Sequence, residues 1–135
     1  MKAILVLLFL IPFSGLSQNT LSVVVQKVNS SSGRVSVAVY NESEGFLDFG
    51  KVYRSGSTRA NMGTTTVTVD DLPNGIYAVA VFHDINDNDE LDTNWMGIPK
   101  EDVGFSNAKM KLFGPPTFKE CRFTINSDSE IQVSL

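Results

Sequence analysis

The chain has 135 residues, which is enough for one domain and too few for two ordinary ones. Its formal net charge is −4 and it has no run of basic residues, which argues against a nucleic-acid-binding protein. Cys121 is the single cysteine, so no internal disulfide can form and an apolar core must stabilise the fold.

Residues 1–17 have the pattern of a secretory signal peptide. Lys2 supplies a positive charge, residues 3–13 form an apolar run, and the small residues Gly15 and Ser17 precede Gln18 as a signal peptidase requires. The apolar run is shorter than the roughly 20 residues needed to span a bilayer. We therefore expect cleavage after Ser17, a secreted or periplasmic protein that does not span the membrane, and one domain over residues 18–135.

Alternation of apolar and polar residues predicts β-strands through most of this domain. The alternating segments are 21–28, 33–40, 64–71, 121–125 and 131–135. A further segment, IYAVAVFH at 76–83, is apolar on both faces and predicts a central strand that is covered on both sides. Short strands separated by turns predict an all-β fold, an antiparallel β-sandwich of about seven strands.

Turn residues separate the predicted strands. Residues 30–33 are expected to join the first two strands as a hairpin. Pro73 and Gly75 predict a tight turn, because proline fixes φ and glycine supplies a positive φ. Tyr77 follows this turn in the manner of a tyrosine corner, in which the hydroxyl closes onto nearby backbone.

Residues 84–119 break the strand pattern. This segment is rich in Asp, Asn, Gly and Pro, yet it also carries large apolar side chains. Irregular loops of this length are uncommon in compact domains and are usually functional where they occur. We expect the segment to pack onto the sandwich and to contain the functional site.

Four segments of the chain resemble a known family: VAVYNESEGFLD, DLPNGIYAVAVFHDINDNDELDTNWMGIPKE, GFSN and FGPPTFKE. On these segments the chain, from Val35 onward, resembles a bacterial family catalogued as domain of unknown function 2141. The resemblance implies an exported sandwich of immunoglobulin-like or transthyretin-like type and implies no established activity. Members of the family tend to have glycine within the Asp/Asn loop, where this chain has Asp89.

The Asp/Asn loop, HDINDNDELDTN, has the oxygen spacing of a calcium site. Asp84, Asn86, Asn88 and Asp92 stand at positions 1, 3, 5 and 9 of an EF-hand-like loop, and Glu90 would add its backbone carbonyl from position 7. Such spacing lets alternate side-chain oxygens converge on one hard cation. We expect a weak calcium site that orders the long loop.

Two departures weaken the match to an EF-hand. Asp89 stands at position 6, where glycine is usual, and Trp95 stands at position 12, where a bidentate glutamate is usual. Glu101 and Asp102, further along the chain, are alternative candidates to complete the ligand shell. The alternative is a solvated loop in which Asn and Asp only form Asx turns.

His83, the single histidine, adjoins Asp84. A small hydrolase-like enzyme would use it as a general base oriented by Asp84 and Glu101. No nucleophile elbow of the G-x-S-x-G type is present, so we favour a non-enzymatic role. In that role His83 caps the loop through a hydrogen bond.

Two remaining residues have alternative roles. Trp95 is a candidate to stack on a sugar ring or anchor a protein partner, or else it plugs the end of the sandwich. Cys121 alternates with Phe123 and Ile125, which predicts an inert, buried thiol. The sequence thus favours a secreted, calcium-stabilised module that binds an unidentified ligand or envelope protein. The alternatives are a small enzyme using His83 and a carbohydrate-binding module using Trp95.

Overall fold

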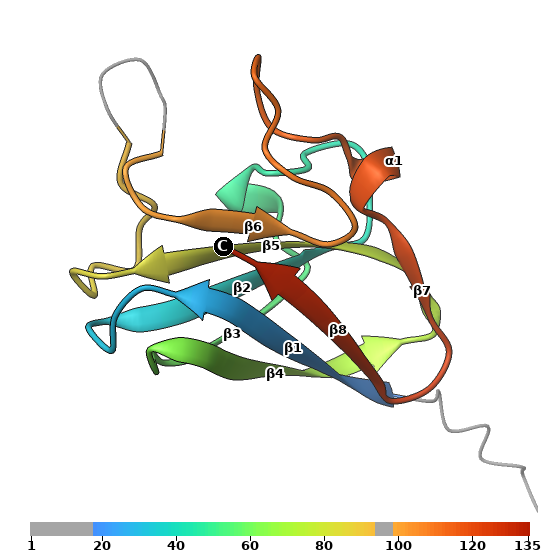
Figure 1. Ribbon diagram of the computed structural model, residues 1–135. Coiled ribbons are helices and arrows are strands. Elements are labelled where there is room, and N and C mark those ends of the chain that lie inside the picture. Colours follow the sequence, from blue (N-terminus) through green and yellow to red (C-terminus); the bar gives the residue numbers. More distant parts are fainter. Residues whose placement is uncertain (1–17, 94–98) are drawn as a thin grey trace, which may run out of the picture.

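Two β-sheets pack face to face in the computed structural model, which describes residues 18–93 and 99–135 (Figure 1). The strand order is β4-β1-β8 in one sheet and β3-β2-β5-β6 in the other, where β7 also pairs with β5. The elements are β1 (Gln18–Val28), β2 (Arg34–Tyr40), the 3-10 turn η1 (Phe49–Lys51), β3 (Arg54–Arg59), β4 (Gly63–Pro73), β5 (Gly75–Asp84), β6 (Val103–Phe105), α1 (Phe118–Cys121), β7 (Phe123–Ile125) and β8 (Ser129–Ser134). The predicted all-β sandwich is confirmed.

Alternating valines form the core between the sheets. Successive side chains of a strand point to opposite faces, so every second residue can be buried. Val23 and Val25 of β1 face Val37 of β2 and Val79 and Val81 of β5, and all are buried in one cluster. The residues between them face the other side of each sheet, and in β1 they are less buried than the valines of the core.

β5 is the central strand that its composition predicts. It pairs with β2 on one edge and with both β6 and β7 on the other. Its outward residue Ala78 is itself buried, against Phe105 and Cys121. The strand is therefore covered on both faces, as expected for a segment that is apolar throughout.

The expected hairpin between the first two strands is wrong. β1 pairs with β4 and β8, whereas β2 pairs with β3 and β5, so residues 30–33 cross from one sheet to the other. Gly33 has a φ of +70°, and a Cβ there would lie 2.0 Å from the carbonyl oxygen of Asp84. Turn residues therefore marked the reversal correctly, but they carry no information about which strand becomes the neighbour.

The strand count and one direction also differ from the prediction. β3 has no apolar pattern, because its sequence is RSGSTR, and β6 has only three residues within the segment expected to be irregular. β8 runs parallel to β1, unlike the antiparallel pairs elsewhere. Cys121 ends α1 rather than lying in a strand, although it is buried as expected.

The turn after β4 is the predicted tyrosine corner. The Tyr77 hydroxyl donates a hydrogen bond of 2.6 Å to the carbonyl oxygen of Pro73. This contact fixes the bend by which the chain passes from β4 in one sheet to β5 in the other. Within the described residues, no helix is long and apolar enough to cross a membrane.

Candidate functional site

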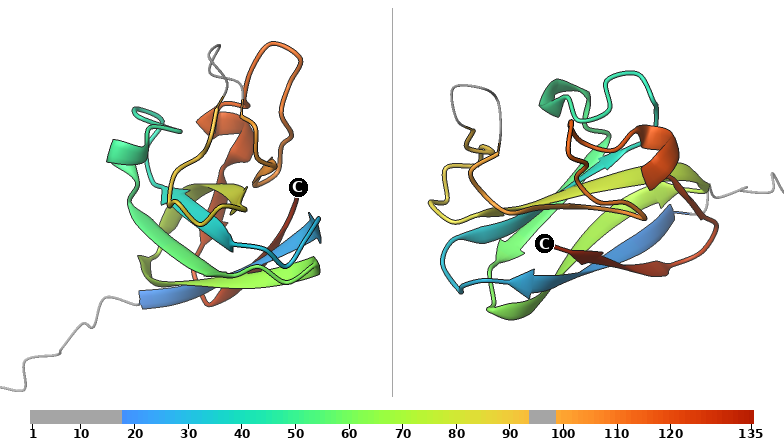
Figure 2. Two further views of the ribbon diagram at one scale, coloured as in Figure 1. Left: turned by 90° about the vertical axis from the view of Figure 1, so that its left-hand side faces the viewer. Right: turned by 45° about the horizontal axis from the view of Figure 1, so that its top comes forward.

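Three loops rise from the outer face of the five-stranded sheet (Figure 2). Residues of all three loops line an open cavity of about 610 Å³. The described residues of these loops are 41–53, 85–93 with 99–102, and 106–117. Two of the three belong to the segment in which the sequence predicts the functional site. The cavity lies on the sheet face that points away from the main core.

Ala38 and Ala80 form the floor of the cavity. They lie directly opposite each other in the β2–β5 ladder. Both strands alternate valine with alanine, and the valines take the core face, so the small alanine side chains face the loops. Larger side chains surround the two alanines, since Tyr40, Phe82 and Phe105 also line the cavity.

The walls of the cavity are apolar. Leu47 and Phe49 come from the first loop, and Leu91 and Pro99 come from the second. The third loop contributes Met110, Leu112, Phe113 and Pro115. Among the described lining residues, Lys111 has the one charged side chain, and its ammonium group binds the Glu120 carboxylate outside the cavity.

Tyr40 supplies a hydroxyl that stays neutral. Burial, and secondarily the nearby negative charge of Asp48, raises the pKa of Tyr40 to about 12. The hydroxyl is therefore protonated throughout the physiological pH range. The described lining thus offers mainly apolar contact, together with a hydroxyl that can donate or accept a hydrogen bond.

The Asp/Asn loop begins beside this cavity, at the end of β5. The Asp84 side chain is fully buried, and its carboxylate accepts hydrogen bonds from the backbone N–H groups of Asn88 (3.2 Å) and Asp89 (2.7 Å). These bonds reach backbone four and five residues along the chain, whereas an Asx turn of the alternative interpretation bonds only two residues on. The two bonds hold the loop in a tight curve around one carboxylate.

The predicted ligands Asn86, Asn88 and Asp92 lie together. The Asn86 and Asn88 amides donate to the two carboxylate oxygens of Asp92 at 2.6 and 2.9 Å. These bonds, with that of Asn88 first, hold the pKa of Asp92 below its ordinary value. Glu90 joins the group through its backbone, whose N–H donates to the Asn88 side-chain oxygen at 3.0 Å.

Glu101 ties the two limbs of the loop together. One of its carboxylate oxygens accepts the N–H of Ile85 at 2.8 Å, and the other accepts the N–H of Asp92 at 2.9 Å. The residue is 9% exposed. The structure thus places Glu101 at the loop, where the sequence made it a candidate ligand.

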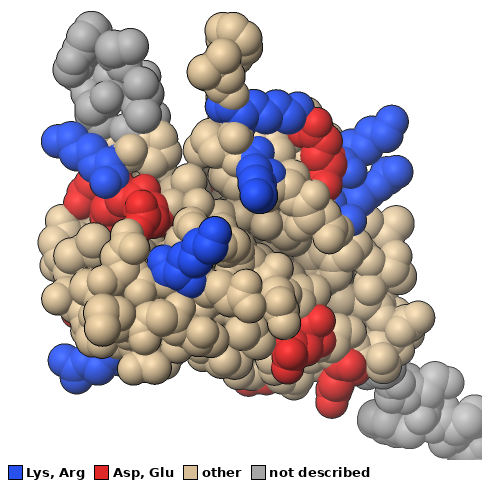
Figure 3. Space-filling model, viewed as in Figure 1, with Lys and Arg blue, Asp and Glu red and all other residues tan. Residues whose placement is uncertain are grey.

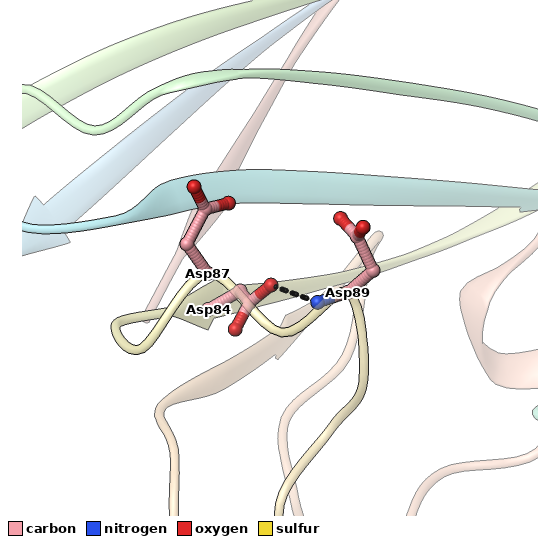
Figure 4. A group of neighbouring side chains, drawn as sticks. All are labelled: Asp84, Asp87 and Asp89. Atoms are coloured by element: carbon pink, nitrogen blue, oxygen red, sulfur yellow. Dashed lines mark hydrogen bonds between the residues drawn. The ribbon is translucent and has the colours of Figure 1, made fainter.

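A second acidic group was not anticipated from the spacing. Carboxylate oxygens of Asp84, Asp87 and Asp89 lie within 4.8 Å of one another, in a geometry that could hold a metal ion (Figure 4). Asp87 and Asp89 have φ values of 54° and 60°, and Figure 4 shows their carboxylates on the same side of the loop. Asp89 thus adopts the left-handed conformation expected at position 6.

His83 is fully buried. Its Nε2–H donates to the carbonyl oxygen of Ser32 at 2.7 Å, and its backbone N–H donates to the Asp102 carbonyl at 3.0 Å. Because His83 and Asp84 are consecutive strand residues, their side chains point to opposite faces of the sheet. The imidazole ring of His83 therefore holds the 30–33 crossing in place. The hydrolase alternative needs this ring beside the carboxylates, and the two are not brought together.

Trp95, the basis of the carbohydrate-binding alternative, lies outside the described residues. The sequence interpretation missed the apolar cavity. A signal for it was present, because the paired strands read VAVY and AVAVF, in which the outward positions combine small alanines with the aromatic residues Tyr40 and Phe82. What the sequence could not supply was the register that brings Ala38 opposite Ala80.

Comparison with known proteins gives one match. A family model described as an uncharacterised protein conserved in bacteria (DUF2141) matches residues 23–133. Neither a curated protein nor a solved structure matches this chain. The match covers both sheets and all three loops around the cavity, so the site belongs to the part of the chain that the family model describes.

Proposed function

Because the chain belongs to the uncharacterised bacterial family DUF2141, we propose its function from its geometry: it binds the apolar chain of a small amphipathic molecule. The observation that carries this proposal is the cavity of about 610 Å³ over Ala38 and Ala80. That volume lies within the roughly 300–1,000 Å³ of small-molecule pockets, which are mostly apolar.

The lining chemistry favours an alkyl or acyl chain over a sugar. Recognition of a sugar requires placed carboxylate, amide or hydroxyl groups, whereas the described walls offer mainly aliphatic and aromatic carbon. Burial of a methylene contributes about 0.8 kcal/mol without any directional contact. The polar head of such a ligand would remain at the mouth, near Lys111.

The test is a homologous series of alkyl carboxylates that displace an environment-sensitive naphthalene dye. If the chain enters the cavity, the dissociation constant falls about fourfold for each added methylene and levels off when the cavity is full. A dissociation constant that does not depend on chain length would contradict the proposal.

Two variants locate the binding. Ala80→Phe places a ring on the floor of the cavity and should weaken binding at least about tenfold, since the chain loses two or more methylene contacts. Thr66→Phe adds the same ring to an exposed position on β4, in the other sheet, and serves as the control. Equal affinity of the two variants would place the ligand elsewhere.

We also propose that the Asp/Asn loop binds one structural calcium ion. Support comes from the oxygen-rich group at the end of β5, where the carboxylates of Asp84, Asp87 and Asp89 lie together without a cationic partner among the described residues. A cation would relieve the repulsion between these like charges. A site without a dedicated bidentate glutamate should be weak, with a dissociation constant on the order of 10⁻⁴ to 10⁻³ M.

Thermal melting tests the calcium proposal. At calcium equal to about five dissociation constants, linkage predicts a stabilisation of about 1 kcal/mol relative to chelator. Asp87→Asn with Asp89→Asn should abolish the shift if the acidic group binds the ion. Asn86→Ala with Asp92→Asn should abolish it if the EF-hand-like set does. Identical melting temperatures of the wild type in calcium and in chelator would mean that the loop binds no calcium and only forms Asx turns.

The chain is further proposed to be exported, from the pattern of residues 1–17. Mass spectrometry of the protein recovered outside the cytoplasm should show an N-terminus at Gln18. Recovery of the exported protein with Lys2 retained would contradict this proposal.

A further inference from the structure

The 106–117 loop has a projecting turn at its tip, and the two central residues of that turn are Leu112 and Phe113 (Figure 1). Their side chains are 90% and 98% exposed, which makes them the most exposed large apolar residues in the described chain. Two-residue turns usually contain Gly, Asn or Asp, for reasons of backbone conformation. Turn formation therefore does not explain the choice of leucine and phenylalanine.

The turn is closed by its own backbone. The N–H of Lys111 donates to the Gly114 carbonyl at 2.8 Å, and the N–H of Gly114 donates to the Lys111 carbonyl at 3.3 Å. At the base of the loop, the partly buried ring of Phe118 packs edge-on against Phe46 at 5.8 Å. The two apolar side chains are thus presented on a braced turn whose flanking polar groups are already paired, which lowers the cost of entering an apolar medium.

Basic residues surround this turn, although the whole chain is acidic. The segment 109–122 contains Lys109, Lys111, Lys119 and Arg122, all exposed, against the single acidic residue Glu120. Figure 3 shows Lys and Arg side chains gathered on this side of the molecule, whereas acidic side chains gather near the end of β5. A small apolar tip that projects beside several positive charges is complementary to an anionic membrane surface.

We propose that the tip formed by Leu112 and Phe113 inserts shallowly into an anionic bilayer surface, with the surrounding lysines at the headgroups. A protein partner fits this feature less well, because a stable protein interface buries about 800 Å² on each side. Two side chains on a convex turn offer far less area than that. The inference does not depend on the pocket ligand, although the same turn borders the mouth of the cavity.

The test is sedimentation of the exported protein, as processed by the producing cell, with vesicles of phosphatidylethanolamine and phosphatidylglycerol. The wild type should bind, and Leu112→Ser with Phe113→Ser should lower the partition coefficient at least about tenfold. Met62→Ser is the matched control, because Met62 is 65% exposed in the turn between β3 and β4, outside this basic segment. That variant should bind as the wild type does.

Two further measurements separate the contributions. Lys109→Gln with Lys119→Gln should weaken binding and reduce its dependence on salt, because fewer cations face the headgroups. The emission of a Phe113→Trp variant should shift to the blue on vesicles and be quenched by lipids brominated near the headgroup. Ala80→Phe should bind vesicles normally, which distinguishes this proposal from the pocket ligand.

The proposal is overturned if the wild type fails to bind anionic vesicles at low ionic strength. The tip would then be inferred to bind a groove on a protein partner. It is also overturned if the double serine variant binds as well as the wild type. An unshifted Phe113→Trp emission in the bound state would have the same consequence, because the tip would then remain in water.

Discussion

The Cys121 side chain is fully buried at the end of α1. Burial, and secondarily the neighbouring Glu120 carboxylate, raises the pKa of the thiol to about 11. The thiolate is the nucleophilic form of cysteine, so the native protein holds almost none of it at neutral pH. Cys121 is therefore a small apolar core residue, as its position in the sequence pattern predicts.

Ellman's reagent at pH 8 should accordingly react slowly with the native protein and rapidly after denaturation. Because the thiol binds its proton more tightly when folded, the free energy of unfolding should fall between about pH 9 and 11. That fall should be smaller in Cys121→Ala, which also loses about 1–2 kcal/mol from the cavity that it creates. Rapid labelling of the native thiol would show that the site opens.

At the scale of single residues, the spacing of the Asp and Asn residues predicts which side chains lie together better than it predicts their backbone conformation. It brought Asn86, Asn88 and Asp92 together correctly, because alternate residues of a curved loop share a side. It missed the approach of Asp87 and Asp89, because that depends on positive φ values. The place of Asp89 at position 6 predicts its positive φ, whereas no position in the EF-hand pattern predicts that of Asp87.

At the scale of the structural elements, the segment 30–33, which crosses from one sheet to the other, depends on a single glycine. Gly33 has a φ of +70° and lies against the carbonyl of Asp84, at the point where β5 ends. A side chain there strains the backbone and also separates the crossing from β5. The His83 bond to Ser32 should weaken at the same time, since both contacts hold the same crossing.

Gly33→Ala should therefore lower the free energy of unfolding by about 2–4 kcal/mol, combining left-handed strain with displacement of backbone. Gly63→Ala is the matched control, because Gly63 also has a positive φ of +93° but nothing lies within 4 Å of the added Cβ. It should lose about 1–2 kcal/mol, for strain alone. Urea denaturation followed by far-ultraviolet circular dichroism measures both, and equal losses would mean that the crossing tolerates the side chain.

Strand positions were predictable where burial enforces a period of two, as in β1, β2 and β4, and where a short run is apolar on both faces, as in β5. β3 and β6 were not, because an edge strand of RSGSTR and a strand of three residues bury too little to create a pattern. The parallel pairing of β8 with β1 was also beyond prediction. Strand neighbours are set by contacts across the whole chain, and local sequence does not record them.

In the whole molecule, the sandwich acts as a platform and the loops on one sheet face carry the candidate functions. The segment 85–102 contributes to both proposed sites. It supplies Leu91 and Pro99 to the cavity wall, and it contains two carboxylates of the calcium proposal, those of Asp87 and Asp89. Its two limbs are joined by the Glu101 bond to the Asp92 N–H at 2.9 Å and by the Lys100 N–H bond to the Asp92 carbonyl at 2.8 Å.

This shared segment predicts coupling between the two sites. An ion that holds the loop in one conformation removes part of the ordering cost that an apolar ligand would otherwise meet at the Leu91 wall. Alkyl-carboxylate affinity should therefore rise about fivefold in calcium relative to chelator, at the low end of typical coupling. Reciprocity requires calcium affinity to rise by the same factor when the ligand is bound, and isothermal titration calorimetry can measure both.

Asp87→Asn with Asp89→Asn should keep the calcium-free ligand affinity and lose the increase. Calcium that stabilises the fold without changing ligand affinity would show instead that the loop and the cavity wall respond independently.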